Sequence, residues 1–90
     1  MQNKVSDIQI IPIRPKDGLV AFASFVFDDS FYCSSIGIHT RPSGGYRLSY
    51  PNRKLPSGDL PVFHPINKEI ADAIEQCVST KFEELIMGGL

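Results

Sequence analysis

The chain has 90 residues, of which 42% are hydrophobic and 21% charged, and its formal net charge is −1. This length predicts one small domain over residues 1–90, and the composition is too hydrophobic for a disordered chain. No apolar run approaches the roughly 18 residues that a membrane span needs, and the first ten residues lack the layout of a secretory signal, so we expect a cytoplasmic protein.

The first two thirds of the chain predict β structure. Residues 7–13 are rich in isoleucine, but Pro12 cannot donate a hydrogen bond to a ladder, so this strand is expected at an edge or a bulge. Turns and strands then alternate along the chain, with turns at 15–18, 28–30 and 41–45 and strands at 19–27, 31–39 and 46–50. These spacings predict an antiparallel meander of four to five strands.

One helix is predicted at the C-terminal end, over residues 68–87. Apolar residues recur there with a period close to 3.6 residues, at Ile70, Ile74, Cys77, Val78, Phe82 and Leu85. Asn67 is a suitable N-cap, Glu69 lies in the first turn, where the helix dipole favours an acid, and Gly88–Gly89 ends the pattern. The predicted fold class is therefore α+β, with a β meander followed by one C-terminal helix.

The strand at 19–27 has two apolar faces. Alternation places Leu19, Ala21, Ala23, Phe25 and Phe27 on one face, and Val20, Phe22, Ser24 and Val26 on the other. One helix covers only one of these faces, so the other needs a partner. A second copy of the chain is the simplest candidate, which predicts a homodimer joined through β structure. The alternative is a sheet that curls enough to bury its own second face.

The sequence predicts neither catalysis nor metal binding. A cysteine and a histidine could form a nucleophile–base pair, but no orienting group or oxyanion loop accompanies them. Two isolated His and two isolated Cys also lack the spacing of a metal site, and no phosphate-binding glycine motif is present. We therefore expect no enzyme, no cofactor and no small-molecule substrate. Cys33 and Cys77 are expected as small buried thiols, with a single bridge between them as the alternative.

The small net charge hides an uneven distribution. Residues 1–68 hold eight Lys and Arg against five Asp and Glu, whereas residues 69–90 hold one against five. The stretch 41–54 has four bases and no acid: Arg41, Arg47, Arg53 and Lys54. With Tyr46 and Tyr50, whose rings could stack on bases, these residues predict a nucleic-acid contact in which the basic side chains bind phosphates. The alternative is that they are ordinary solvated charges.

Two long segments and the N-terminal start carry a resemblance. They read "GLVAFASFVFDDSFYCSSIGI" at 18–38, "GYRLSYPNRKLPSGDLPVFHPIN" at 45–67, and "VSDIQI" near the start. In this order they resemble the SpoVG proteins, the stage V sporulation protein G or septation regulator family. The likeness spans roughly residues 4–86, and its most telling pieces are "ASFVFDDSF", "PNRK" and "HPIN".

The resemblance implies a small α+β domain that dimerises through its strands. It also implies a bacterial DNA- and RNA-binding regulator with effects on septation, sporulation and gene expression, without catalytic activity or cofactor. Arg53 and Lys54, in the stretch 50–58, are the positions that it points to as nucleic-acid contacts.

The leading hypothesis is a homodimeric regulator that binds DNA or RNA. Its expected contacts are Arg41, Arg47, Tyr50, Arg53 and Lys54, with the stretch 50–58 as a contact loop. The alternative is a protein-interaction module that docks on a division or regulatory protein through a sheet edge or the acidic helix, without binding nucleic acid.

Overall fold

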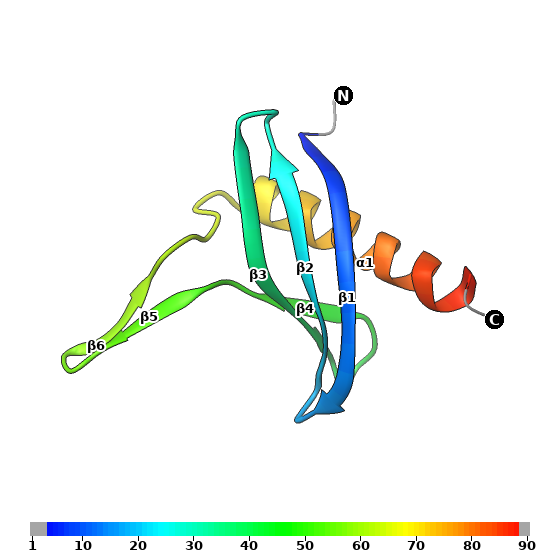
Figure 1. The fold of residues 1–90 in the computed structure, drawn as a ribbon, viewed down its shortest axis with the longest axis horizontal. Helices are drawn as coiled ribbons and strands as arrows, with labels where there is room; N and C mark the ends of the chain where they lie inside the picture. Colours follow the sequence, from blue (N-terminus) through cyan, green and yellow to red (C-terminus); the bar gives the residue numbers. More distant parts are fainter. Residues whose placement is uncertain (1–3, 89–90) are drawn as a thin grey trace.

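The computed structural model describes residues 4–88, in which six strands precede one helix. A four-stranded antiparallel sheet has the order β1 (Val5–Lys16), β2 (Leu19–Phe27), β3 (Phe31–Thr40) and β4 (Tyr46–Ser49). A separate hairpin follows, with β5 (Asn52–Leu55) and β6 (Gly58–Pro61), and then α1 (Lys68–Gly88). The four-stranded sheet and α1 form the body, and the hairpin at 52–61 projects from it as an arm (Figure 1). The predicted α+β meander with one C-terminal helix is confirmed.

β1 lies at one edge of the sheet, as Pro12 predicted. Pro12 pairs with Ala21, and the ladder shifts register on both sides of this region, between Ser6 and Gln9 and between Pro12 and Lys16. An edge strand has one side without ladder partners, so a residue that lacks an N–H is tolerated there.

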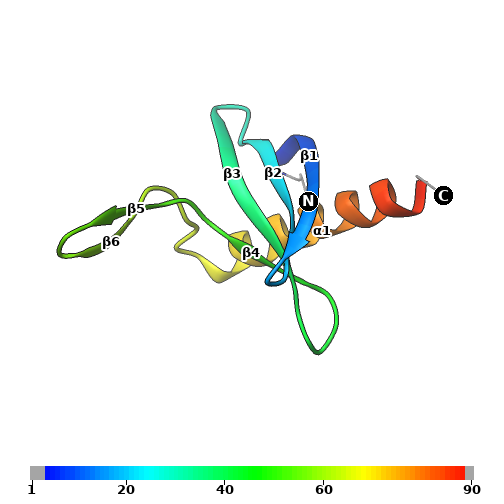
Figure 2. The ribbon, with the colours of Figure 1, turned by 60° about the horizontal axis from the view of Figure 1, so that its bottom comes forward.

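α1 packs on one face of the sheet (Figures 1 and 2). The helix contributes buried residues at intervals of four, which places them on one side of an α-helix. The buried apolar core is formed by Val5, Ala21, Ala23, Phe25, Cys33, Ile36, Ile38, Leu48, Ile74, Val78 and Phe82. The ring of Tyr46 meets Phe82 edge to face, with centroids 5.2 Å apart. The apolar stripe ends at Phe82, because the last turns of α1 extend past the sheet (Figure 1) and Leu85 is 45% exposed.

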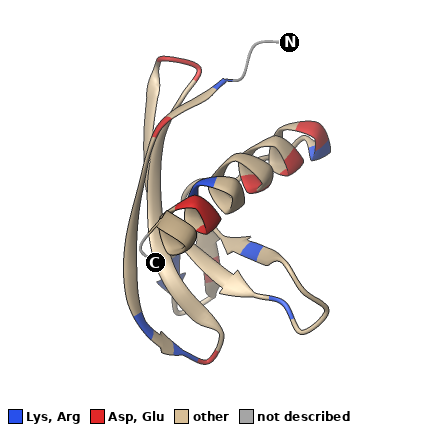
Figure 3. Ribbon diagram, turned by 90° about the vertical axis from the view of Figure 1, so that its right-hand side faces the viewer, with Lys and Arg blue, Asp and Glu red and all other residues tan. Residues whose placement is uncertain are grey.

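The other face of the sheet carries no helix, and we call it the open face (Figure 3). Ladder pairing and alternation assign to it the side chains of Ser6, Gln9, Ile11, Lys16, Leu19, Phe22, Ser24, Val26, Tyr32, His39, Arg47 and Ser49. The prediction of a second apolar face holds for Phe22 and Val26 of β2, but neighbouring strands add polar groups. The open face is therefore of mixed polarity.

Two residues of β2 lie on faces opposite to those that simple alternation predicted. The ladder between β2 and β3 shifts register between Leu19 and Ala21. Leu19 consequently lies on the open face beside Gly37, while Val20 packs against the core. A single-residue shift reverses the face of every side chain beyond it.

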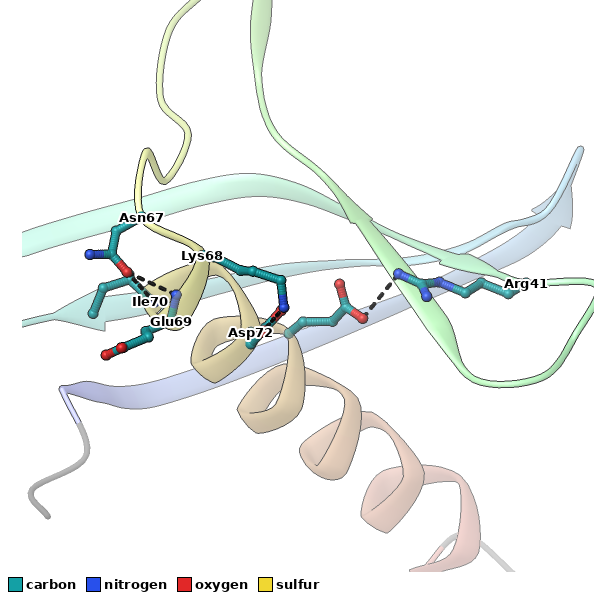
Figure 4. A network of polar contacts seen from close by, with 7 residues as sticks. Arg41, Asn67, Lys68, Glu69, Ile70 and Asp72 are labelled. Carbon is teal, nitrogen blue, oxygen red and sulfur yellow. Dashed lines mark hydrogen bonds and ion pairs between the residues drawn. The ribbon is translucent and has the colours of Figure 1, made fainter.

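The N-terminus of α1 is capped as predicted. The Asn67 side-chain oxygen accepts hydrogen bonds from the backbone N–H groups of Glu69, at 2.8 Å, and Ile70, at 3.2 Å (Figure 4). Gly88 is the last described residue of the helix, and Gly89 lies outside the described residues. Over residues 4–88, no helix is both long and apolar enough to cross a membrane.

Candidate nucleic-acid interface

The stretch 50–58, predicted as a contact loop, forms the first strand of the arm and its turn. The arm pairs Asn52 with Pro61, Arg53 with Leu60, Lys54 with Asp59, and Leu55 with Gly58. Gly58 has a φ of 129°, a conformation that only glycine adopts readily. The loop prediction is thus wrong in form, because the turn brings residues 58–61 back beside 52–55. All residues of both strands are exposed.

Arg53 and Lys54 point to opposite faces of the arm, because side chains alternate along a strand. Arg53 shares its face with Leu60, whereas Lys54 lies opposite Asp59. The negative charge of Asp59, directly across the ladder, reduces the positive electrostatic potential around Lys54. Among the described residues, the ion pairs are Arg41–Glu75 and Lys68–Asp72, so neither Arg53 nor Lys54 takes part in one.

Arg41 belongs to the loop between β3 and β4, and this loop lies apart from the arm (Figure 1). Its guanidinium donates a hydrogen bond to Glu75 of α1 at 3.1 Å (Figure 4), and both side chains are partly exposed. Such a surface pair contributes only about 0–1 kcal/mol. The four predicted bases therefore do not form one patch, since β4 separates Arg41 from Arg53 and Lys54.

Arg47 is exposed on β4 and lies opposite His39 on the open face. The His39 ring Nε2 and the Ser49 hydroxyl form a hydrogen bond of 2.9 Å. Burial, and then the positive charge of Arg47, lower the pKa of His39, so its neutral form is favoured. Arg47 is thus a positive group that projects from the end of the sheet opposite the β2–β3 turn.

Tyr50 lies where the arm joins the body. Its ring is half buried and packs against Phe63, with centroids 5.8 Å apart and the rings tilted by 52°. Burial raises the pKa of Tyr50 to about 12, and the charges of Glu75 and Cys33 act in the same direction. Tyr50 therefore helps to hold the base of the arm, and its predicted stacking on a nucleic-acid base stays a prediction.

α1 is an acidic helix, with Asp and Glu along much of its length (Figure 3). The helix carries two Lys against five acids: Glu69, Asp72, Glu75, Glu83 and Glu84. Three of these acids line a shallow groove of about 360 Å³ with Tyr46 and Gln76. Because like charges repel, a polyanion is disfavoured on this side of the molecule. The arm and the open face remain as its routes of approach.

The structure offers little for metal or thiol chemistry. Within residues 4–88, no three His, Cys, Asp or Glu side chains gather as a metal site would require. Cys33 is buried and its burial raises the pKa of the thiol, which lowers its reactivity. Cys33 and Cys77 are not bridged to each other, so the alternative of a disulfide is wrong for this structure.

Sequence comparisons cover the body and the arm together. The sequence model of the SpoVG family matches residues 3–84. A protein of Caldicellulosiruptor saccharolyticus named "Putative septation protein SpoVG" is 32% identical over 87 residues, which cover 96% of this chain and 98% of that protein. Proteins of the same name from Onion yellows phytoplasma and Treponema denticola are 32% and 26% identical, over 92% and 90% of this chain and 84% and 87% of their own lengths.

Proposed function

The chain belongs to the SpoVG family, and we propose that it is a cytoplasmic, non-catalytic regulator of septation that binds nucleic acid as a homodimer. The names of its relatives, which describe them as septation proteins, support the proposed role in septation. The observation that carries nucleic-acid binding is the arm, which presents Arg53 and Lys54 on an exposed hairpin, outside the ion pairs found within residues 4–88.

Phosphate oxygens are the ligands that suit these two side chains. A guanidinium binds a phosphate through two parallel hydrogen bonds, and an ammonium binds it as a point charge. Arg53 and Lys54 point to opposite faces of the arm. A nucleic-acid strand that wraps across the arm therefore contacts Arg53 on one face and Lys54 on the other. The hairpin holds their backbone in place, which limits the entropy lost on binding.

The other expected contacts differ in how readily they can act. Arg47 is exposed on the open face and can bind a phosphate directly. Arg41 can do so only after leaving Glu75, which costs little for a surface pair. Tyr50 contributes through the position of the arm, because its ring packs against Phe63.

The homodimer is proposed to form through the β structure of the arm. A two-stranded hairpin alone is at best marginally stable in water. Leu55, Leu60 and Val62 are 38%, 50% and 64% exposed, so the arm and its base present apolar surface that a second copy could bury, with Arg53 of the same face at the solvent-exposed rim of the contact. Sedimentation at micromolar concentration should give the mass of a dimer, and a stable monomer would contradict this part of the proposal.

The test of nucleic-acid binding compares two double variants. Arg53→Ala with Lys54→Ala should weaken binding to all sequences and reduce the slope of log K against log salt by about 2 per contacting subunit. Lys68→Ala with Lys81→Ala removes the same charge from the helix and should leave that slope unchanged. Gel shifts with single-stranded RNA, single-stranded DNA and duplex DNA at several salt concentrations provide the measurement.

A different result would favour the protein-interaction alternative. If the chain passes through heparin and DNA resins at low salt, nucleic-acid binding is wrong. The acidic groove on α1, lined by Asp72, Glu75 and Glu83, would then be the surface to examine for a basic partner protein.

A further inference from the structure

We propose that the open face of the sheet binds single-stranded nucleic acid, with bases stacked on Tyr32 and Phe22. This inference rests on the proposed nucleic-acid function and adds the class of ligand and a second site. The arm would then hold phosphates, while the sheet would hold unpaired bases.

Two aromatic rings project from the open face. Tyr32 of β3 is 73% exposed and Phe22 of β2 is 39% exposed. Tyr32 pairs with Val26, four residues along β2 from Phe22, so the backbone positions of the two residues are separated by about 13 Å along the strand at roughly 3.3 Å per residue. Ile11, which is 66% exposed and pairs with Phe22, extends the apolar surface onto β1.

A depression of about 420 Å³ lies between these side chains. Polar groups line it together with Tyr32 and Phe22: Gln9, Ser24, Ser34 and Ser35. An amide and three hydroxyls can donate and accept hydrogen bonds, which is what the edge of an unpaired base requires. Aromatic planes beside such groups are typical of sheets that bind single strands.

Charge on the open face also favours a polyanion. Successive ladder pairs form a row across the sheet from Lys16 through Leu19 and His39 to Arg47. This row places two basic side chains, Lys16 and Arg47, at one end of the aromatic surface. None of the side chains that the described ladders assign to the open face is an acid, whereas the helix side carries five. Asp28 and Asp29 lie in the β2–β3 turn beside Tyr32, so the face is positive at the end of Lys16 and Arg47, and phosphates are expected there.

The polarity of the face distinguishes this ligand from a second copy of the chain. Interfaces of obligate homodimers are as apolar as a domain core. Here Gln9, Ser24 and Ser34 line the same depression as Tyr32, and the His39–Ser49 hydrogen bond occupies the space above Gly37. A methyl group at Gly37 would lie 2.5 Å from the Ser49 hydroxyl oxygen, so this polar pair is built into the face. Exposed aromatic rings among polar groups are better suited to stacking with nucleic-acid bases than to forming an apolar interface that excludes water.

The test measures affinity for a labelled single strand of about 12 nucleotides and for a duplex of the same sequence by fluorescence anisotropy. Tyr32→Ala should weaken single-strand binding about tenfold, because one stacked base is lost. The salt slope should not change, because no phosphate contact is removed. Tyr32→Phe keeps the ring and should bind within about twofold of the original chain, while duplex binding should be the same in all variants.

Phe31 provides the matched control. It precedes Tyr32, is 62% exposed, and alternation turns it away from the open face. Phe31→Ala should therefore leave single-strand binding unchanged. Because the chain contains no Trp, Tyr32→Trp also introduces a single tryptophan that can be excited selectively, and stacking on a base should quench its fluorescence. Phe31→Trp should show no such quenching.

Each outcome has one meaning. Unchanged single-strand binding in Tyr32→Ala would overturn the open-face site while the arm and the proposed function stand. Failure of the original chain to bind any oligonucleotide would overturn both. If Tyr32→Ala turns a dimer into a monomer in sedimentation, the open face is a contact between copies and the inference is wrong.

Discussion

The arm and the body differ most in how much of each is buried. In the body, Phe25, Ile36 and Ile74 have at most 1% of their surface exposed, and side chains from α1 and all four strands form the core. In the arm, every residue of β5 and β6 is exposed. The difference indicates a division of roles, in which the body supplies stability and the arm supplies charge that can change without unfolding the chain.

The largest expected effect tests this division through stability. Phe25→Ala should lower the free energy of unfolding by about 3–5 kcal/mol, because it removes a fully buried ring and leaves a cavity. Leu60→Ala in the arm should change it by less than about 0.5 kcal/mol, because the side chain is half exposed and lies outside the core. Urea unfolding followed by circular dichroism gives both values.

Protein concentration is the control for this pair. If the arm dimerises, the Leu60→Ala effect should grow as the concentration rises, while the Phe25→Ala effect should remain nearly constant. Equal losses in both variants at submicromolar concentration would show that the arm belongs to the same folding unit as the body.

The body was largely predictable from the sequence because burial leaves a periodic pattern. The apolar period at Ile70, Ile74 and Val78 placed α1 within one residue of its bounds, and Asn67 marked its start. The register shift beside Leu19 was not predictable, because a bulge is an extra residue in a ladder and not a change in composition.

The arm left no such pattern. Its strands, "NRKL" and "GDLP", contain one apolar Leu each among polar residues and Pro61, and Pro56–Ser57 is not one of the usual two-residue hairpin turns. The basic side chains themselves could be found locally, as Arg53 and Lys54 are adjacent. The acid that pairs with Arg41 could not be found in this way, because Glu75 is 34 residues away in the sequence and meets Arg41 only in the fold.

A second prediction concerns Tyr50, at the junction of body and arm. Burial raises the pKa of Tyr50 from 10.0 to about 12, so at intermediate pH the unfolded chain has lost a proton that the folded chain keeps. The stabilisation is complete below pH 10 and is lost as the pH rises through 12, because the unfolded state binds fewer protons over that range. Urea unfolding at about pH 9 and about pH 11 should show this loss.

Tyr50→Phe isolates the contribution of the phenol. This variant lacks the titrating group, so its free energy of unfolding should fall less between the two pH values than that of the original chain. Parallel losses in the two proteins would mean that the junction is open to water and that Tyr50 ionises equally in both states.

The smallest expected effect concerns Asp59, the acid opposite Lys54 in the arm. Asp59→Asn should tighten nucleic-acid binding about two- to threefold at low salt, because it removes a negative charge beside a phosphate contact. Glu84→Gln makes the same change of charge at an exposed position on α1, away from the arm and the open face. Its effect should be smaller, and the difference between the two variants should shrink as salt shortens the range of each charge to about 8 Å. Equal gains in both variants would mean that net charge governs binding, and the distinction between a charged arm and a structural body would fail.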